Sequence, residues 1–159
     1  MLHITPKRWN FKFTFFRIRE TFRGKGGRHR MRTAFFGGTF DPVHKGHIAI
    51  AQAVLDQKLA DRILFVPAPN PPHKTEQFIT PFKNRYDMLS MALAEHDGFE
   101  LSDMERLRTG KSYTIDSLEA LSANPARGEI LLLVGADSLC QLHTWKRPHD
   151  LVKSFRIVT

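Results

Sequence analysis

The sequence predicts an α/β fold built on a parallel sheet with helices on both faces, and three observations carry this prediction. From residue 31 onward, short apolar runs alternate with stretches whose apolar residues recur at helical spacing. Strands that are apolar on both faces are typical of parallel sheets buried between helices. Gly, His and Asp residues that could contact a ligand follow the apolar runs. We therefore expect a ligand site outside the carboxyl ends of the strands, where the strand order reverses.

The first half of this region predicts two strands and two helices. Residues 32–36 form an apolar run that two glycines end, and residues 46–58 follow with apolar residues at helical spacing. Residues 62–66 form a second apolar run, after which comes a proline-rich loop. A helix is expected over residues 81–95, with Pro81 in its first turn. The apolar residues of that helix are Tyr86, Leu89, Met91 and Leu93.

The second half continues the same alternation. Strands are predicted over residues 99–102, 130–134 and 155–158. Thr114 is a candidate N-cap for a helix that Pro125 ends. Residues 136–142 predict a short helix, and a second short helix runs through residues 151–152.

The positive charge of the chain is confined to its first thirty residues. The formal net charge is +8, and residues 1–30 alone hold nine Lys and Arg residues against one acidic residue. Residues 31–159 hold fifteen of each and are therefore neutral. We expect two parts, a basic and poorly ordered extension over 1–30 and a folded domain over 31–159. The position of Met31, directly before the first strand, favours an extension that does not belong to the fold.

Two other functions for residues 1–30 stay open. Arginines interleaved with five phenylalanines and Trp9 could bind single-stranded nucleic acid through phosphate contacts and stacking. A segment rich in Arg and poor in acids could also be an organelle transit peptide, although it contains almost no Ser or Ala.

Cysteine content and hydropathy indicate a cytoplasmic protein. The single cysteine, Cys140, excludes an internal disulfide and fits a reducing compartment. No apolar run approaches the roughly 20 residues that span a bilayer. The apolar stretch over residues 11–16 is interrupted by Lys12 and is not followed by a small-residue cleavage site, so a secretory signal peptide is not expected.

Residues 37–47, which read Gly-Gly-Thr-Phe-Asp-Pro-Val-His-Lys-Gly-His, are the richest stretch chemically. The two glycines let backbone approach a ligand closely, and a helix that begins near Gly46 offers free N–H groups to an anion. His44 and His47 are three residues apart, so one helical turn points both imidazoles at the same anion. Imidazole donors suit charge that develops on phosphate oxygens during phosphoryl transfer. The sequence lacks the G-x-x-x-x-G-K-[ST] pattern of a P-loop.

Two plainer interpretations of this stretch remain. It could be a glycine turn and helix start with incidental histidines. The histidines could also form a metal site, completed by His73, although no H-E-x-x-H pattern supports zinc. Asp41 is expected to bond backbone in the turn before Pro42.

Residues 37–47 resemble the G-G-T-F-D-P-x-H-x-G-H signature of the bacterial nicotinate-nucleotide adenylyltransferases, members of the H-x-G-H nucleotidyltransferase superfamily. Residues 71–74 are similar to the P-P-H-[KR] loop of that family, and residues 112–114 to its S-Y-T helix start. Residues 135–138 with Trp145 are similar to its G-x-D-S…W block. The resemblance implies a Rossmann-like, doubly wound nucleotidyltransferase fold. It also implies adenylyl transfer from ATP to nicotinate mononucleotide in NAD biosynthesis.

The resemblance also implies roles for individual residues. The catalytic pair is His44 and His47. The implied ATP-binding residues are Gly37, Gly38, Thr39, Phe40, Gly46, Gly135 and Asp137. The implied substrate-binding residues are Lys74, Tyr113, Thr114 and Trp145. Mg²⁺ is expected on the ATP phosphates rather than in a protein cage. Plainer roles stay open for three of these residues: a helix N-cap for Asp137, a core side chain for Trp145 and a solvated loop lysine for Lys74.

The chain also departs from the family pattern. The family continues with further sheet and an I-S-S-T-x-I-R-like motif, whereas this chain ends at Thr159 in a predicted strand. We therefore expect a sequence truncated at its C-terminus, and an inactive nucleotide-binding fragment is an alternative to an active enzyme. Nicotinamide mononucleotide and phosphopantetheine are alternative substrates. Pantetheine-specific relatives usually carry Thr at the position of His44, which disfavours the latter.

Overall fold

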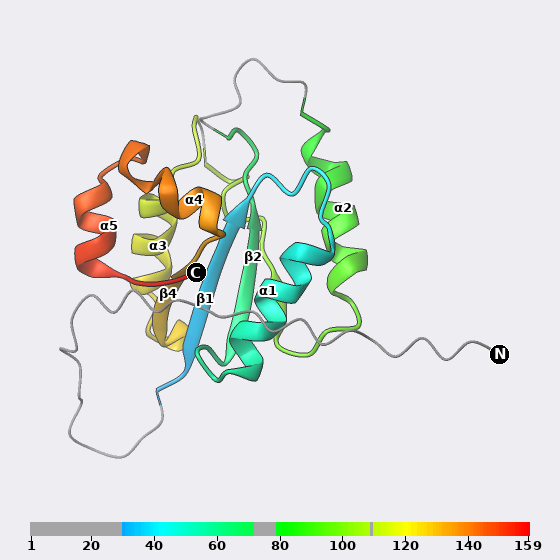
Figure 1. Ribbon diagram of the computed structural model, residues 1–159. Coiled ribbons are helices and arrows are strands. Elements are labelled where there is room, and N and C mark those ends of the chain that lie inside the picture. Colours follow the sequence, from blue (N-terminus) through cyan, green and yellow to red (C-terminus); the bar gives the residue numbers. More distant parts are fainter. Residues whose placement is uncertain (1–29, 72–78, 109) are drawn as a thin grey trace.

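The fold is a parallel sheet between two layers of helices, as expected. The computed structural model describes residues 30–71, 79–108 and 110–159 (Figure 1). Five parallel strands lie in the order β3-β2-β1-β4-β5. The strands are β1 (Arg32–Gly38), β2 (Arg62–Pro67), β3 (Phe99–Leu101), β4 (Glu129–Leu133) and β5 (Arg156–Val158). The helices are α1 (Lys45–Asp56), α2 (Phe82–Leu93), α3 (Thr114–Ser122), α4 (Ala136–Cys140) and α5 (Pro148–Ser154), with short 3₁₀ turns η1 (Pro125–Arg127) and η2 (Leu142–Thr144).

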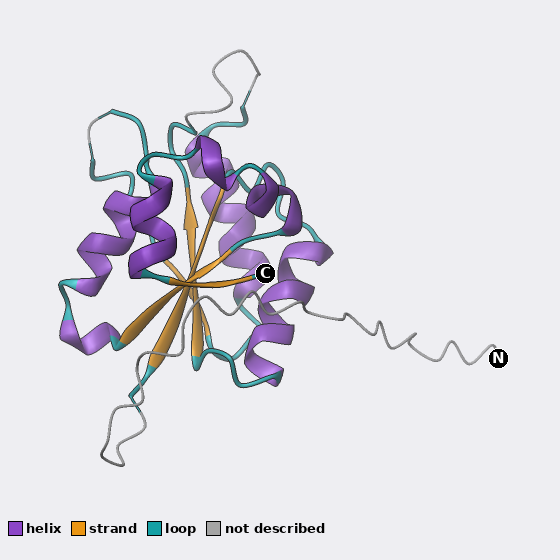
Figure 2. Cartoon of the chain, turned by 60° about the vertical axis from the view of Figure 1, so that its left-hand side comes forward, coloured by secondary structure: helices purple, strands orange, loops and turns teal. Residues whose placement is uncertain are grey.

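Helices cover both faces of the sheet (Figures 1 and 2). Two apolar cores hold the layers together, one on each face. Successive side chains of a strand point to opposite faces, so Phe36 joins the core under α1 and α2, whereas Phe35 joins the core under α3 and α5. Both phenylalanines are buried. The continuous apolar runs in the sequence therefore reflect strands that are covered on both sides.

The strand order reverses at β1. From β1 the chain moves to β2 and then to β3, and it afterwards returns to the other side of β1 to form β4 and β5. The segments that leave β1 and β4 at their carboxyl ends therefore diverge and leave a crevice between them. The sequence motifs at 37–47 and 135–138 follow these two strands.

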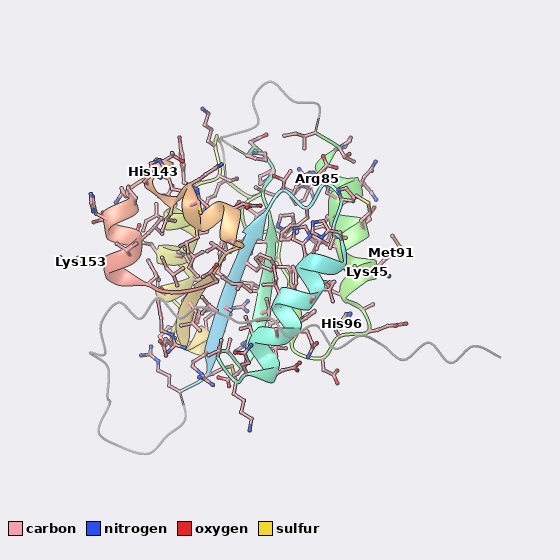
Figure 3. All side chains as sticks on the ribbon, viewed as in Figure 1. Lys45, Arg85, Met91, His96, His143 and Lys153 are labelled. Atoms are coloured by element: carbon pink, nitrogen blue, oxygen red, sulfur yellow. The ribbon has the colours of Figure 1, made fainter. Side chains whose placement is uncertain are left out.

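The helix expected over 81–95 is present, but not all of its apolar residues are buried. Met91 points away from the fold and is 71% exposed (Figure 3). The residues of α2 that are buried are Arg85, Leu89 and Leu93, which recur at a spacing of four. Pro81 is the N-cap and lies just before the first turn.

The N-cap of α3 is not Thr114, as the sequence predicts, but the residue before it. Tyr113 is the N-cap of α3, with extended backbone at φ −111° and ψ 129°, and Thr114 is the first helical residue. The helix otherwise buries the residues expected from their spacing, Ile115, Leu118 and Leu121.

The basic extension over 1–30 lies outside the described residues except for Arg30, so its role stays a prediction. Within the described part of the chain, no helix is long and apolar enough to cross a membrane.

Candidate active site

A cavity of about 690 Å³ opens at the carboxyl ends of the strands, where the sequence predicts a ligand site. Its walls come from the segments that follow β1, β2 and β4, together with the start of α3 and the turn η2. The predicted site residues that line it are Gly37, Gly38, Thr39, Phe40, His44, Gly46, His47, Tyr113, Thr114, Gly135, Asp137 and Trp145. Lys74 and His73 lie outside the described residues.

The floor of the cavity requires glycine at the end of β1. A Cβ atom on Gly37 would lie 2.7 Å from Cε1 of Phe35, whose side chain is fully buried and cannot move away. A Cβ on Gly38 would lie 3.1 Å from Cζ of Phe40. Phe40 itself has a left-handed backbone, with φ 49°, and its ring is buried. The two glycines thus keep this floor open, and the left-handed backbone of Phe40 turns the chain after β1.

His44 and His47 lie side by side at the start of α1, as their spacing predicts. His44 is the N-cap, and its backbone N–H donates to Nδ1 of His47 at 3.2 Å. The two imidazole rings are 3.7 Å apart between centroids and inclined by 31°. A Cβ at Gly46 would lie 3.0 Å from Cε1 and Nδ1 of His44, so a side chain at this position would push against the His44 ring.

His47 is held as a neutral donor. Burial, and secondarily the neighbouring His44, lower the pKa of His47 to about 4. Its ring lies 5.0 Å from Phe40 and 6.0 Å from Phe36, measured between centroids. Because Nδ1 accepts the His44 N–H, the proton of the neutral imidazole is on Nε2. His47 therefore offers one directed N–H group to a ligand without adding a charge.

The depressed pKa of His47 predicts a loss of stability in mild acid. The unfolded chain takes up a proton on this histidine near pH 6.5, whereas the folded chain does so only near pH 4. The free energy of unfolding should therefore fall as the pH decreases from about 6.5 to 4. Urea unfolding at pH 7 and pH 5 measures it, with His47→Gln as the reference. The raised pKa of Glu105 acts in the opposite direction in both proteins and cancels in the comparison. An equal pH dependence of the two proteins would contradict the prediction.

Arg85 connects three loops beneath the cavity through hydrogen bonds, and it was not among the residues predicted from the sequence. Its guanidinium donates to the carbonyl oxygens of Thr39 at 2.6 Å, Ala68 at 3.0 Å and Thr80 at 2.8 Å. The side chain is 1% exposed and lies at the start of α2, beside the loop that follows β1 (Figure 3). Burial lowers the pKa of Arg85, and the charge of Asp41 opposes this shift. A guanidinium nonetheless stays charged, so Arg85 fixes the loops as a buried cation.

Asp41 bonds backbone as expected, but its partner is distant in sequence. The N–H of Thr80 donates to Oδ2 of Asp41 at 2.8 Å. This bond joins the loop after β1 to the segment that leads into α2. It therefore supports the same connection between loops that Arg85 makes.

Tyr113, Thr114 and Trp145 line the cavity on the side of α3 and η2. Tyr113 and Trp145 also pack against the core on that face of the sheet, so the plainer interpretation of Trp145 as a partly buried core residue is compatible with a place at the site. The Nζ atom of Lys146 lies 4.5 Å from the centroid of the Tyr113 ring. It also pairs with Oδ2 of Asp116 at 2.9 Å. Lys146 lines the cavity and was not among the predicted site residues.

Beneath these residues lies a buried carboxylate that sequence reasoning also missed. Glu105 is 4% exposed, and its Oε1 accepts a bond from the Ser117 hydroxyl at 2.6 Å. Burial raises the pKa of Glu105, while hydrogen bonds from Ser117 and Ser112 oppose the shift. Arg108 donates to Ser117 Oγ and to the carbonyl of Asp116, both at 3.1 Å. This network fixes the start of α3, which carries Tyr113 and Thr114.

The end of β4 and the start of α4 form another wall of the cavity. Gly135 is the N-cap of α4, and Asp137 is an exposed residue in the first turn of this five-residue helix. The plainer interpretation of Asp137 as the N-cap is therefore wrong.

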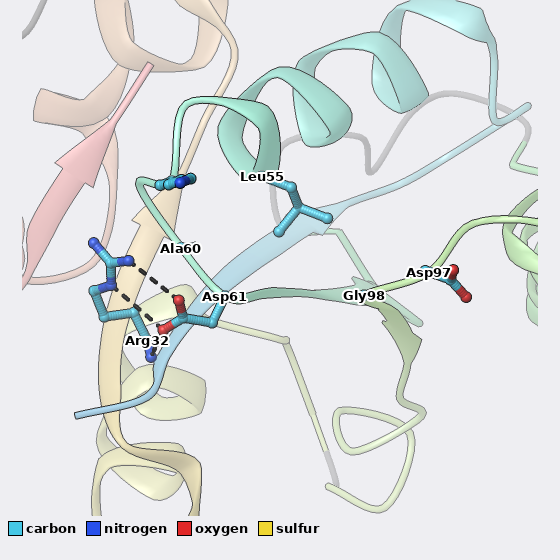
Figure 4. Close-up of a pocket in the computed structure, with 7 residues that line it drawn as sticks. Arg32, Leu55, Ala60, Asp61, Asp97 and Gly98 are labelled. Carbon is cyan, nitrogen blue, oxygen red and sulfur yellow. Dashed lines mark hydrogen bonds and ion pairs between the residues drawn. The ribbon is translucent and has the colours of Figure 1, made fainter. Parts of the chain in front are cut away.

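A second hollow, of about 600 Å³, lies at the opposite end of the sheet (Figure 4). Its wall includes Arg32 and Asp61, whose side chains bind each other at 3.1 Å. None of the predicted site residues lines it.

Known proteins are similar to this chain in sequence over most of its length. The model of the cytidylyltransferase-like family matches residues 35–159. Proteins named probable nicotinate-nucleotide adenylyltransferase are similar as well. That of Clostridium tetani is 39% identical over 80% of this chain and 64% of its own length. That of Solibacter usitatus is 39% identical over 80% of this chain and 68% of its own length. The chain thus spans less than two thirds of the C. tetani protein.

A solved structure supports the fold. The structure of Plasmodium falciparum nicotinic acid mononucleotide adenylyltransferase complexed with NaAD superimposes with a TM-score of 0.67, at 19% identity, over 77% of this chain and 60% of that one. The parallel sheet is thus the Rossmann-like fold of nucleotidyltransferases. By sequence, the chain belongs to the cytidylyltransferase-like family and, within it, to the family of the nicotinate-nucleotide adenylyltransferases.

Proposed function

We propose that this chain carries the site at which ATP adenylylates nicotinate mononucleotide in NAD biosynthesis. A 5′-phosphate oxygen of the mononucleotide attacks the α-phosphorus of ATP. The bond from that phosphorus to the oxygen that bridges it to the β-phosphorus breaks, and the electron pair leaves with pyrophosphate. The products are nicotinate adenine dinucleotide and pyrophosphate.

The observation that carries this proposal is the composition of the cavity between β1 and β4. Donors for phosphate oxygens, His44 and His47, lie at one side of it, and two aromatic side chains, Tyr113 and Trp145, lie at the other. A nucleotide substrate requires both kinds of surface, since it joins a polyanion to an aromatic base. Two relatives that are 39% identical to this chain are named probable nicotinate-nucleotide adenylyltransferase.

The chain's own residues need only position phosphates and stabilise charge. The attacking oxygen is already an anion, so neither a protein nucleophile nor a strong base is required. His47 donates its Nε2–H to an ATP phosphate oxygen, and His44 contacts the same phosphates. Free N–H groups at the start of α1 add a favourable dipole. The lack of side chains at Gly37 and Gly38 lets these phosphates approach the backbone.

The remaining roles concern the nucleosides. We assign Asp137, beside Gly135, to a ribose hydroxyl, because its carboxylate is exposed at the cavity wall. Trp145 supplies a ring face to the pyridine, with Tyr113 and Thr114 in the same part of the cavity. A role for Lys74 beside the substrate stays a prediction.

We propose that Mg²⁺ arrives on the triphosphate. Among the described residues, no group of three His, Cys, Asp or Glu side chains could hold a metal ion. Mg²⁺ commonly keeps several waters and binds mainly substrate phosphates. Bound there, it neutralises charge on the departing pyrophosphate.

We place the activity in the cytoplasm, since Cys140 is an exposed free thiol, as is usual in reducing compartments.

Pyrophosphate release from ATP tests the proposal. The chain of residues 1–159 is assayed with nicotinate mononucleotide, nicotinamide mononucleotide and phosphopantetheine. We expect turnover with nicotinate mononucleotide above that with the other two. Protection by ATP against thermal unfolding without turnover would identify a nucleotide-binding protein instead. If the chain showed no turnover and no protection by ATP, the proposed site would be ruled out.

A further inference from the structure

We propose that Lys146 determines specificity, by selecting a mononucleotide whose pyridine ring bears a carboxylate over one that bears an amide. This inference rests on the proposed function and deepens it. It starts from the charges that line the cavity. Among the described residues of its wall, Lys146 is the only Lys or Arg, whereas Asp41, Glu105 and Asp137 are acidic. An anionic substrate therefore meets one ammonium or guanidinium group on the described part of this wall.

The position of Lys146 connects that cation to the aromatic end of the cavity. Its Nζ lies over the Tyr113 ring, 4.5 Å from the centroid, and it directly follows Trp145 in the chain. Both aromatic residues line the cavity. A pyridine ring that stacks in this region brings its substituent near Nζ. The triphosphate end, at His44 and His47, belongs to a different strand end.

Asp116 pairs with the ammonium group without burying it. Oδ2 and Oδ1 of Asp116 lie 2.9 and 3.1 Å from Nζ of Lys146. The side chains of Lys146 and Asp116 are 41% and 36% exposed, so an ammonium group with three donors can bind a second carboxylate in addition to Asp116. A ligand carboxylate gains a charge-assisted hydrogen bond there, whereas a neutral amide gains a weaker one.

Affinity for a matched pair of ligands tests this inference. Nicotinate and nicotinamide mononucleotides share the ribose phosphate and differ in the ring substituent alone. Isothermal titration of the 1–159 chain gives Kd for each. Lys146→Gln should raise Kd for nicotinate mononucleotide roughly 10-fold, because one hydrogen bond to a charged group is lost. Its Kd for nicotinamide mononucleotide should change less than about 2-fold.

Two further variants separate selectivity from other roles of the lysine. Lys153→Gln removes the same charge from the exposed outer side of α5, away from the cavity (Figure 3), and should leave both Kd values unchanged. Asp116→Asn removes the ion pair but keeps the ammonium, so the preference for nicotinate mononucleotide should persist or increase. If Asp116→Asn instead loses the preference as Lys146→Gln does, the ion pair only shapes the start of α3 and the inference is overturned.

Two other outcomes of the Lys146→Gln titrations would also overturn the inference. Equal weakening of both ligands by Lys146→Gln would show that the lysine binds the shared phosphate, and an unchanged preference would show that it does not contact the ring substituent. Either result overturns the inference and leaves the proposed function intact. Failure of the unsubstituted chain to bind either mononucleotide would overturn the proposed function and the inference together.

Discussion

Replacing His47 with Asn should lower turnover about 10²- to 10³-fold, the usual cost of removing one donor aimed at developing charge. The Asn amide oxygen can still accept the N–H of His44, as Nδ1 of His47 does at 3.2 Å. The variant therefore keeps the start of α1 but loses the Nε2–H donor. Initial rates of pyrophosphate release at saturating ATP measure the effect, and KM for the mononucleotide should change little.

The converse substitution, His47→Gln, is the matched control. Its amide nitrogen reaches the position of Nε2, whereas nothing replaces Nδ1 as acceptor. We expect this variant to retain more turnover than His47→Asn and to be less stable. If both variants turned over like the unsubstituted chain, His47 would have no part in phosphate transfer. Greater activity of the Asn variant would show that the bond to His44 matters more than the donor.

Replacing Arg85 with Met should lower the free energy of unfolding by about 3 kcal/mol. Methionine fills a similar volume but leaves the part-buried carbonyls of Thr39, Ala68 and Thr80 without the donor that they share, and a polar group left unpaired away from water costs about 1–3 kcal/mol. Arg85→Lys should cost less, since an ammonium group can still reach one or two of the carbonyls. Urea unfolding measures both variants.

Arg106→Met is the control for this pair. Arg106 and Arg85 both lie over the ring of Phe82, with their guanidinium carbons 5.9 and 5.6 Å from its centroid, but Arg106 is exposed. Its replacement should change stability by less than about 0.5 kcal/mol. A comparable loss from both substitutions would mean that the stacking on Phe82, rather than the carbonyl bonds, is what stabilises the fold.

The location of the site could be predicted because it depends on local patterns. Apolar runs identify buried strands, and a parallel sheet brings all their carboxyl ends to one edge. The motifs after β1 and β4, with Tyr113 and Trp145, therefore meet at one cavity in the structure. The spacing of His44 and His47 likewise determines that one helical turn places them together.

The residues beneath the candidate site, such as Arg85, could not be assigned from local patterns in the same way. One feature of the sequence did point to Arg85. Arg85 stands at the spacing of Leu89 and Leu93, so a charged residue occupies the buried stripe of α2. Met91 is apolar and yet exposed, because hydrophobicity alone does not decide which face of a helix is buried. The partners of Arg85 come from segments separated by 46, 17 and 5 residues, and no local pattern reveals such bonds.

The sequence by itself determined the fold class, the order of elements and the edge of the sheet where the candidate site lies, because each follows from periodicity and from motifs of contiguous residues. The tertiary structure alone decided the protonation of His47, the burial of Arg85 and Glu105, and the place of Lys146 over Tyr113. Charge, desolvation and donor geometry depend on which distant segments pack together, and those contacts form only when the chain folds.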